Sequence, residues 1–470
     1  MSIRILVSAD LHLGRRPSGL PGPVSGELGQ KVAHCSSAQV WQRIVERAIR
    51  ENVDLVLLAG DVVDQDNRFF ESLGPLEQGL SRLHQAGIPV YAVAGNHDWD
   101  TLATMADLLA KRGIPLHLLG RNGQWEKAIF RSRQDEPIRI VGWSFPHPYV
   151  SQSPLEGLEA LGRPTPSDPD ADLPTIGLLH GDLDGVNSQY APVSRRELEA
   201  GPVALWVLGH LHAPEYHPPQ AGAGILVPGS PQGLDPTETG AHGPWLVELE
   251  GRSARTAQVR LTHWPLAPLR YEVCQVDISD LENAAEPDVS ALIRERIHAQ
   301  MTEQLKHIHR DRFAPEVVLV QLTLVGVTPF YSQLEKWLAE KAGEDIQRYE
   351  SSYEAVTARI IRIENQTRPA LDLDQLAQSR NLLGRLARLI LYLQELEGNP
   401  LSQESLPTDA EGIGDIQTLF GEAAKLVQKV RSKYSMLQEN QEGGIPYLIG
   451  IVRQQAYRLS EALAMQRHSP

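Results

Sequence analysis

The sequence has very little cysteine: its 470 residues include two, Cys35 and Cys274, and these show no paired spacing. This scarcity excludes a disulfide framework and a thiolate zinc site, and it favours a reducing compartment. The chain has no run of about 18 apolar residues, so we expect no membrane span. The first residues lead into a strand rather than an apolar signal core, and the sequence therefore predicts a cytoplasmic protein.

The sequence is also short of positive charge, with 44 Lys and Arg against 59 Asp and Glu and a net charge of −15. That balance disfavours broad, non-specific binding to a polyanion. It does not exclude a nucleic-acid substrate, because acidic residues that bind cations reverse the local field. With 41% hydrophobic residues the chain can build a large core, and its length favours two or three domains.

Apolar runs typical of buried strands alternate with amphipathic helical segments through the first 250 residues. The predicted strands include 3–9, 53–59, 88–93, 138–143, 175–179, 203–208, 224–227 and 245–250. The predicted helices cover 40–52, 74–86 and 102–112. The Gly- and Pro-rich residues 15–37 predict a loop. This alternation indicates a layered α/β domain.

Polar residues stand just past the carboxyl ends of five of these strands. They are Asp10, Asp61, Asn96, His180 and His210. Open α/β sheets place their active sites at such ends, so the five side chains can converge on one crevice. Oxygen and nitrogen ligands without thiolate suit manganese, iron or zinc. The ligands suffice for two ions, and two ions about 3.5–4 Å apart serve in-line attack on phosphorus.

The motifs around these residues follow one another in a recognisable order. They are Asp10-Leu11-His12, Gly60-Asp61, Gly95-Asn96-His97-Asp98, His180 and Gly209-His210-Leu211-His212. Each alone has a rival interpretation as an ordinary turn, but together they resemble the full motif set of the calcineurin-like metallophosphoesterases. That resemblance covers about residues 1–250 and implies two mixed sheets flanked by helices. The finer resemblance is to the DNA-repair exonuclease branch, the SbcD-like subunits. Within it, Tyr190-Ala191-Pro192 and the segments 228–233 and 238–240 are most similar to the YhaO-like group.

The resemblance implies two divalent ions, with manganese as the first choice and iron, zinc or magnesium as alternatives. One ion would be held by Asp10, His12, Asp61 and His212. The other would be held by Asp61, Asn96, His180 and His210. Asp61 would therefore bridge the two ions.

The resemblance also implies that His97 is not a ligand. It would face the substrate as a general acid or as a stabiliser of the leaving oxygen. Asp64 would orient His97, since a carboxylate partner fixes the tautomer of an imidazole. Capping of the next turn remains an alternative role for Asp64. Five further histidines are interpreted as satisfied or surface residues: His34, His117, His147, His217 and His242.

Three regions are expected along the chain: a nuclease domain at 1–264, a capping domain at 265–366 and a helical, partner-binding region at 367–470. The capping domain would be a small α+β unit, with strands at 271–278, 317–326 and 355–363 and helices at 289–307 and 330–341. The resemblance implies that this unit shapes the DNA-binding groove. A leucine stripe begins the last region, and helices at 415–438 and 446–464 follow. The stripe is made of Leu382, Leu383, Leu386, Leu389, Ile390 and Leu393.

The resulting hypothesis is a manganese-dependent DNA nuclease subunit of a repair complex, with exonuclease or endonuclease activity. The sequence has no Gly-Lys pair and hence no Walker-A loop, so ATP use would require a coiled-coil ATPase partner of the SbcC-like, AAA-type kind. Homodimer formation is left open. The alternatives are a phosphoesterase for a small phosphorylated substrate and a scaffold subunit that tethers DNA or an ATPase. The segment 15–37 is either a surface excursion or a groove wall that contacts phosphates through Arg15, Arg16 and Lys31.

Overall fold

A computed structural model gives the structure of this protein. It describes residues 2–19, 26–64, 69–161, 172–185, 187–219, 222–251, 253, 256–279, 281, 286–331, 334, 337–338, 346, 349–379, 381, 383–384, 386–391 and 456–457. The chain divides into two compact units. The first contains Met1–Cys274, His298–Leu322 and Gln347–Arg362, and the second contains the described residues within 275–297, 323–346 and 363–470. The predicted boundaries at residues 264 and 366 stay predictions. No helix among the described residues is long and apolar enough to cross a bilayer.

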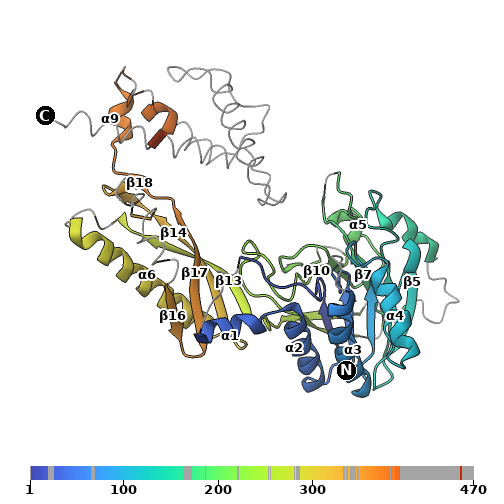
Figure 1. Ribbon diagram of the computed structural model, residues 1–470. Helices are drawn as coiled ribbons and strands as arrows, with labels where there is room; N and C mark the ends of the chain where they lie inside the picture. Colours follow the sequence, from blue (N-terminus) through green and yellow to red (C-terminus); the bar gives the residue numbers. More distant parts are fainter. Residues whose placement is uncertain are drawn as a thin grey trace. The chain divides into compact units, whose positions relative to one another are not determined.

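Two six-stranded mixed sheets form the body of the first unit (Figure 1). The first sheet has the order β12-β11-β1-β2-β3-β4. Strands β1 to β4 are parallel, β11 pairs antiparallel with β1, and β12 pairs antiparallel with β11. Its strands are β1 (Ser2–Ser8), β2 (Leu55–Ala59), β3 (Val90–Val93), β4 (His117–Leu118), β11 (Trp245–Glu250) and β12 (Gln258–His263).

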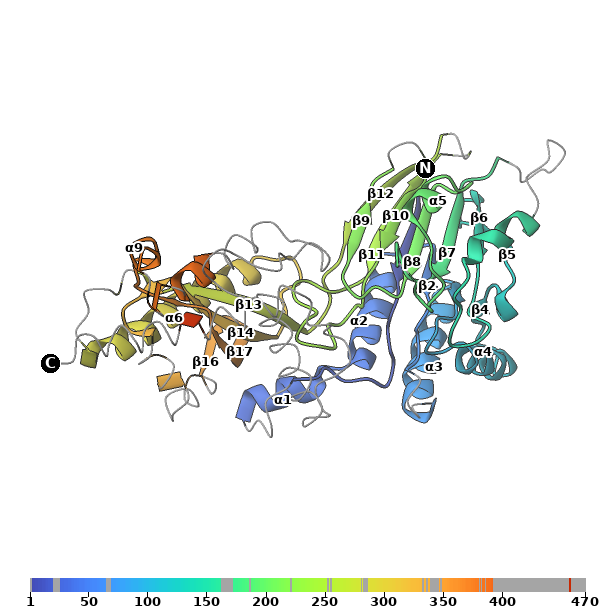
Figure 2. The same ribbon diagram turned by 90° about the horizontal axis from the view of Figure 1, so that it is seen from above.

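The second sheet has the order β5-β6-β7-β8-β10-β9, with a parallel centre from β6 to β10 and antiparallel edges. Its strands are β5 (Glu126–Arg131), β6 (Pro137–Gly142), β7 (Thr175–His180), β8 (Leu205–Gly209), β9 (Glu215–His217) and β10 (Gly224–Val227). Seen from above, β6, β7 and β8 run side by side (Figure 2). The predicted layered α/β fold with two mixed sheets is confirmed.

Alternation along the strands explains the layers. In β1, Ile5 belongs to an apolar cluster that joins both sheets, and this cluster also contains Ile140 of β6 and Leu178 of β7. The next residue, Leu6, belongs to a different cluster on the other face of the sheet. Because successive side chains of a strand point to opposite faces, each buried strand contributes to two layers. This explains why central strands such as β2 and β8 are apolar along their whole length.

Three helices cover the outer face of the first sheet (Figure 1). They are α2 (Ser37–Arg50), α3 (Phe69–Gln85) and α4 (Thr101–Lys111). Ser36 starts α2, because its side chain accepts a hydrogen bond from the N–H of Gln39. The shorter elements on the second sheet are the 3-10 helices η1 (Arg121–Gly123) and η2 (Pro154–Leu161) and the helix α5 (Arg195–Glu199).

The prediction of a loop at 15–37 is wrong for its second half, which forms the helix α1 (Gly26–His34). Leu28 of α1 is 3% exposed and packs in a cluster with Tyr271 and Val317. Lys31 donates to the hydroxyl oxygen of Thr357 at 3.0 Å. Helix formation here follows from this long-range packing, which local composition does not encode.

A four-stranded sheet has the order β13-β14-β17-β16. Its strands are β13 (Leu269–Asp277), β14 (Val317–Val325), β16 (Glu350–Tyr353) and β17 (Val356–Asn365), and the long helix of this region is α6 (Glu286–His309). A strand pair, β15 (Val327–Thr328) with β18 (Arg368–Pro369), and α9 (Leu373–Ala377) follow. The three strands and the first helix predicted for the capping region are therefore found. Most of the predicted helix at 330–341, Leu382, Leu393 and the predicted helices at 415–438 and 446–464 lie outside the described residues, apart from 456–457.

Tyr271 of β13 joins two loops of the first unit, one that contains Ser18 and one that contains Thr239 and Gly240. Its carbonyl accepts a hydrogen bond from the N–H of Gly240 at 2.9 Å, and it pairs with Thr239 in an isolated β-bridge. Its hydroxyl donates to the carbonyl of Ser18 at 2.5 Å. In addition, Gln321 of β14 donates to the carbonyl of Pro236 at 2.6 Å. One strand thus anchors the segment that follows His12 and the segment that follows His212.

Candidate metal centre

The polar residues after the strands adopt an unusual backbone conformation. Asp10, His12, Asp61 and His210 have φ values of 51°, 42°, 47° and 96°, in the left-handed region that L-residues rarely occupy. Backbone hydrogen bonds hold these turns, since the N–H of Asp10 donates to the carbonyl of Gly60 and the N–H of His12 donates to the backbone carbonyl of Asp61. Strain of this kind concentrates at functional sites, because the surrounding structure must enforce it.

Glycines let the strand ends approach one another. A Cβ atom on Gly209 would lie 2.0 Å from the carbonyl oxygen of Ala59 and 2.7 Å from Nδ1 of His180. A Cβ atom on Gly95 would lie 2.1 Å from Oδ1 of Asp61. Both distances are far below van der Waals contact, so the motifs require glycine for steric reasons.

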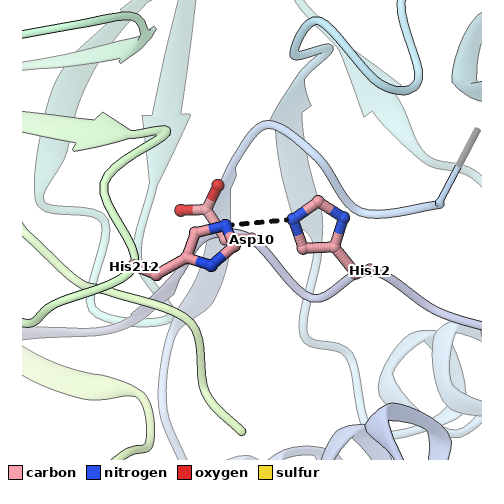
Figure 3. Close-up of side chains that lie close together, drawn as sticks. All are labelled: Asp10, His12 and His212. Carbon is pink, nitrogen blue, oxygen red and sulfur yellow. Dashed lines mark hydrogen bonds between the residues drawn. The ribbon is translucent and has the colours of Figure 1, made fainter. Parts of the chain in front are cut away.

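The first group of candidate ligands is Asp10, His12 and His212, which point toward one another (Figure 3). Nε2 of His12 lies 3.3 Å from Nε2 of His212. On the far sides of the rings, Nδ1 of His212 donates to Glu238 at 2.8 Å and Nδ1 of His12 faces Asp64 at 3.4 Å. These carboxylates favour the proton on Nδ1, which leaves two Nε2 lone pairs beside a buried carboxylate. Such converging acceptors fit a cation.

The second group contains Asp10, Asp61 and His180, with Asn96 beside it. Nδ1 of His180 is 3.0 Å from the carbonyl oxygen of Ala59, to which it donates. Its Nε2 therefore faces the oxygen of Asn96 at 3.1 Å and an oxygen of Asp61 at 3.3 Å. Burial disfavours the imidazolium, yet Asp61 and Asp10 raise the pKa of His180 to about 9. The carboxylates around His180 thus stabilise a positive charge at this position, and a metal ion would supply such a charge.

Asp61 lies between the two groups. One of its oxygens is 3.9 Å from Nε2 of His12 and 3.3 Å from Nε2 of His180. The other accepts a hydrogen bond from the N–H of His97 at 2.9 Å. Burial opposes ionisation, but His180 and His12 hold the pKa of this carboxyl below its usual range. The position suits a bridge, while the bridging role itself stays a prediction.

His210 lies beside the second group. Its N–H donates to both oxygens of Asp10 at 3.1 Å, and its ring centre is 5.4 Å from that of His180. Burial, together with the neighbouring His180, lowers the pKa of His210 to about 3, so the ring is neutral and its lone pair is free of a proton. The structure therefore brings His210 to the centre, while its ligand role stays a prediction.

His97 is partly exposed, with 37% of its side chain accessible to solvent. Its ring packs edge-on against His12, with centres 5.0 Å apart. Asp64 lies 3.7 Å from Nδ1 of His97 and 3.4 Å from Nδ1 of His12. The carboxylate is thus placed nearer to a candidate ligand than to the residue it was predicted to orient, and its role with His97 stays a prediction.

The roles of two carboxylates of the site, the buried Asp98 and the partly buried Glu238, were not predicted. Asp98 is fully buried and accepts hydrogen bonds from the N–H groups of Gly95, Val62 and Val63. Glu238 accepts from His212, from the hydroxyl of Ser230 at 2.9 Å and from the N–H of Leu234 at 2.9 Å. Both residues belong to sequence segments named above, but only the folded structure shows that Asp98 binds backbone N–H groups and that Glu238 binds His212. His242, predicted to be a satisfied histidine, is buried with Nδ1 2.7 Å from the carbonyl oxygen of Ser230.

Comparison with known families identifies the class of this domain. Residues 3–214 match the family described as calcineurin-like phosphoesterase. The chain therefore contains a calcineurin-like metallophosphoesterase domain, and the predicted superfamily is confirmed. The donor atoms described above give this fold a set of candidate residues for two metal ions.

Individual relatives point to one branch of this superfamily. The "Uncharacterized metallophosphoesterase YhaO" of Bacillus subtilis is 27% identical over 343 residues, which cover 71% of this chain and 72% of that protein. The "DNA double-strand break repair protein Mre11" of Aeropyrum pernix is 27% identical over 288 residues, covering 59% of this chain and 64% of that protein. The protein of the same name from Methanopyrus kandleri is 23% identical over 258 residues, which cover 53% of this chain and 54% of that protein. The chain thus spans between half and two thirds of these Mre11 proteins, and the matches support the DNA-repair nuclease branch.

Proposed function

We propose that this protein is the metal-dependent nuclease subunit of a DNA repair complex and hydrolyses DNA phosphodiester bonds. The observation that carries the proposal is the convergence of acceptor atoms from Asp10, Asp61, His12, His180 and His212. The relatives named as double-strand break repair proteins support DNA as the substrate. Manganese is the proposed metal, as the family resemblance implies, and donors that are carboxylate and imidazole without thiolate fit it as they fit iron or zinc.

Two bound ions would activate a water molecule and neutralise charge on the phosphate. The chain's own residues would do the rest. Asp61 keeps the two groups of ligands together, and Glu238 and Asp64 hold the outer nitrogens of His212 and His12. His97, which is partly exposed, would donate a proton to the leaving oxygen or stabilise its charge.

We further propose that the three predicted regions divide the work. The region 1–264 would carry the chemistry, 265–366 would shape the DNA groove, and 367–470 would bind a coiled-coil ATPase. Of the predicted leucine stripe, Leu383, Leu389 and Ile390 are buried, so an apolar face of that segment is covered. Homodimer formation, the choice of exonuclease or endonuclease activity and the cytoplasmic location belong to the same proposal.

The test compares three substrates in the presence of manganese: linear DNA, bis(p-nitrophenyl) phosphate and a small phosphomonoester. We expect cleavage of the DNA and of the small diester, and no cleavage by Asp61→Asn or after chelation of the metal. If the protein hydrolysed the monoester and left the DNA uncleaved, the result would instead favour a small-molecule phosphoesterase. DNA binding without turnover of any substrate would favour the scaffold alternative.

A further inference from the structure

An array of aromatic rings lies beside the candidate metal centre. The ring centre of Tyr190 is 5.1 Å from that of His210, with the planes tilted by 36°. The ring centre of Tyr149 is 6.0 Å from that of Tyr190, with a tilt of 44°. Since the ring of His210 lies 5.4 Å from that of His180, the array leads from the buried ligands outward.

The topology explains why these rings meet. Tyr149 follows β6, Tyr190 follows β7 and His210 follows β8, and these three strands are parallel neighbours. All three side chains therefore stand at the same edge of the sheet, where the candidate ligands converge. The first two loops are also joined directly, since the N–H of Val150 donates to the carbonyl of Gln189 and that of Ala191 donates to Val150.

The outermost ring is exposed to an extent that packing does not explain. Tyr149 is 57% exposed, the highest value among the large apolar side chains that the structure describes as exposed. Tyr190, in contrast, is partly buried between Tyr149 and His210. The loop that presents Tyr149 is held at its base by backbone hydrogen bonds, so the ring is offered on a supported segment.

We propose that Tyr149, backed by Tyr190, is a stacking platform for a nucleobase of a single-stranded or frayed DNA end. This inference rests on the proposed nuclease function and specifies what holds the substrate next to the scissile phosphate. Aromatic rings bind bases through their π-faces without sequence preference, which suits an enzyme that processes many ends. Because the net charge of the chain is −15, general electrostatic attraction contributes little affinity for DNA, and contacts to bases would add to that affinity.

The experiment measures kcat and KM with manganese for two oligonucleotides of equal length. One is an ordinary single strand, and the other carries abasic deoxyriboses in place of its nucleotides. Tyr149→Ala should raise KM for the ordinary strand by about tenfold or more, the scale of one lost base stack. It should leave KM for the abasic strand within about twofold. Tyr149→Phe keeps the ring and should behave as the unmodified protein.

The outcomes separate this inference from the function on which it rests. Equal KM changes for both strands in Tyr149→Ala would overturn the platform while leaving the nuclease intact. An equal loss in Tyr149→Phe would also overturn it, because the hydroxyl and not the ring would then matter. Failure of the unmodified protein to cleave either strand, while it hydrolyses bis(p-nitrophenyl) phosphate, would refute the nuclease function and the platform together. Metal content and melting temperature, measured on each variant, should match those of the unmodified protein.

Discussion

Asp98→Asn tests whether a buried carboxylate holds the turns that carry the candidate ligands. One oxygen of Asp98 accepts from Gly95 at 2.7 Å, and the other accepts from Val62 at 2.7 Å and from Val63 at 3.2 Å. Asparagine has nearly the same shape but a single oxygen. Whichever way its amide turns, an NH₂ group meets a buried backbone N–H.

The cost of this change follows from the hydrogen bonds. One buried N–H without a partner costs about 1–3 kcal/mol, and each bond that changes from charged to neutral loses about 1 kcal/mol. Burial and the nearby Asp61 raise the pKa of Asp98 to about 7, so removal of its charge offsets part of the loss. We expect a net destabilisation of about 2 kcal/mol, and hence a melting temperature lower by roughly 4–8 °C.

The assay is thermal unfolding with metal content measured on the same samples. Metal content should fall as well, because Gly95 precedes Asn96 and Val62 follows Asp61. Asp100→Asn is the matched control: Asp100 is exposed, stands two residues away and provides no side-chain cap to α4. An unchanged melting temperature in Asp98→Asn, equal to that of the control, would refute the reasoning.

Three further predictions address the centre and the C-terminal region. Asp61→Asn should lose turnover and weaken both metal sites, whereas His212→Ala should weaken mainly one; two full equivalents of metal in purified Asp61→Asn would contradict the bridging assignment. His97→Ala should keep both ions and the fold and lose turnover by about a hundredfold or more, the usual scale for an acid–base group. Loss of metal from that variant, measured by elemental analysis, would make His97 a ligand. A chain that ends at Arg368 should still hydrolyse small phosphodiesters with manganese but no longer capture the ATPase in a pull-down. Undiminished capture would place the partner site elsewhere.

Local signals in the sequence predicted the layered α/β domain and the convergence of the metal motifs, because apolar strands and the polar residues after them can be read along the chain. The two mixed sheets were implied by the family resemblance. Strand β12 was not predicted, since its alternating exposure leaves little apolar character in Gln258–His263. Helix α1 was missed for another reason: Leu28 forms part of a cluster with residues more than 200 positions away. The role of Glu238 could not be predicted, because its contact with His212 spans 26 positions and exists only after folding.

The position of Tyr271 bears on how this protein can be dissected. A fragment cut at the predicted boundary, residue 264, would retain every candidate ligand. It would nevertheless lose the strand that accepts from Gly240 and donates to Ser18. The segments behind His12 and His212 would keep the direct hydrogen bonds from Ser18 to Leu234 and Asp235 but lose their shared support from β13, although neither histidine had been altered. The smallest autonomous phosphoesterase is therefore longer than its motifs, and expression trials should retain β13 and β14.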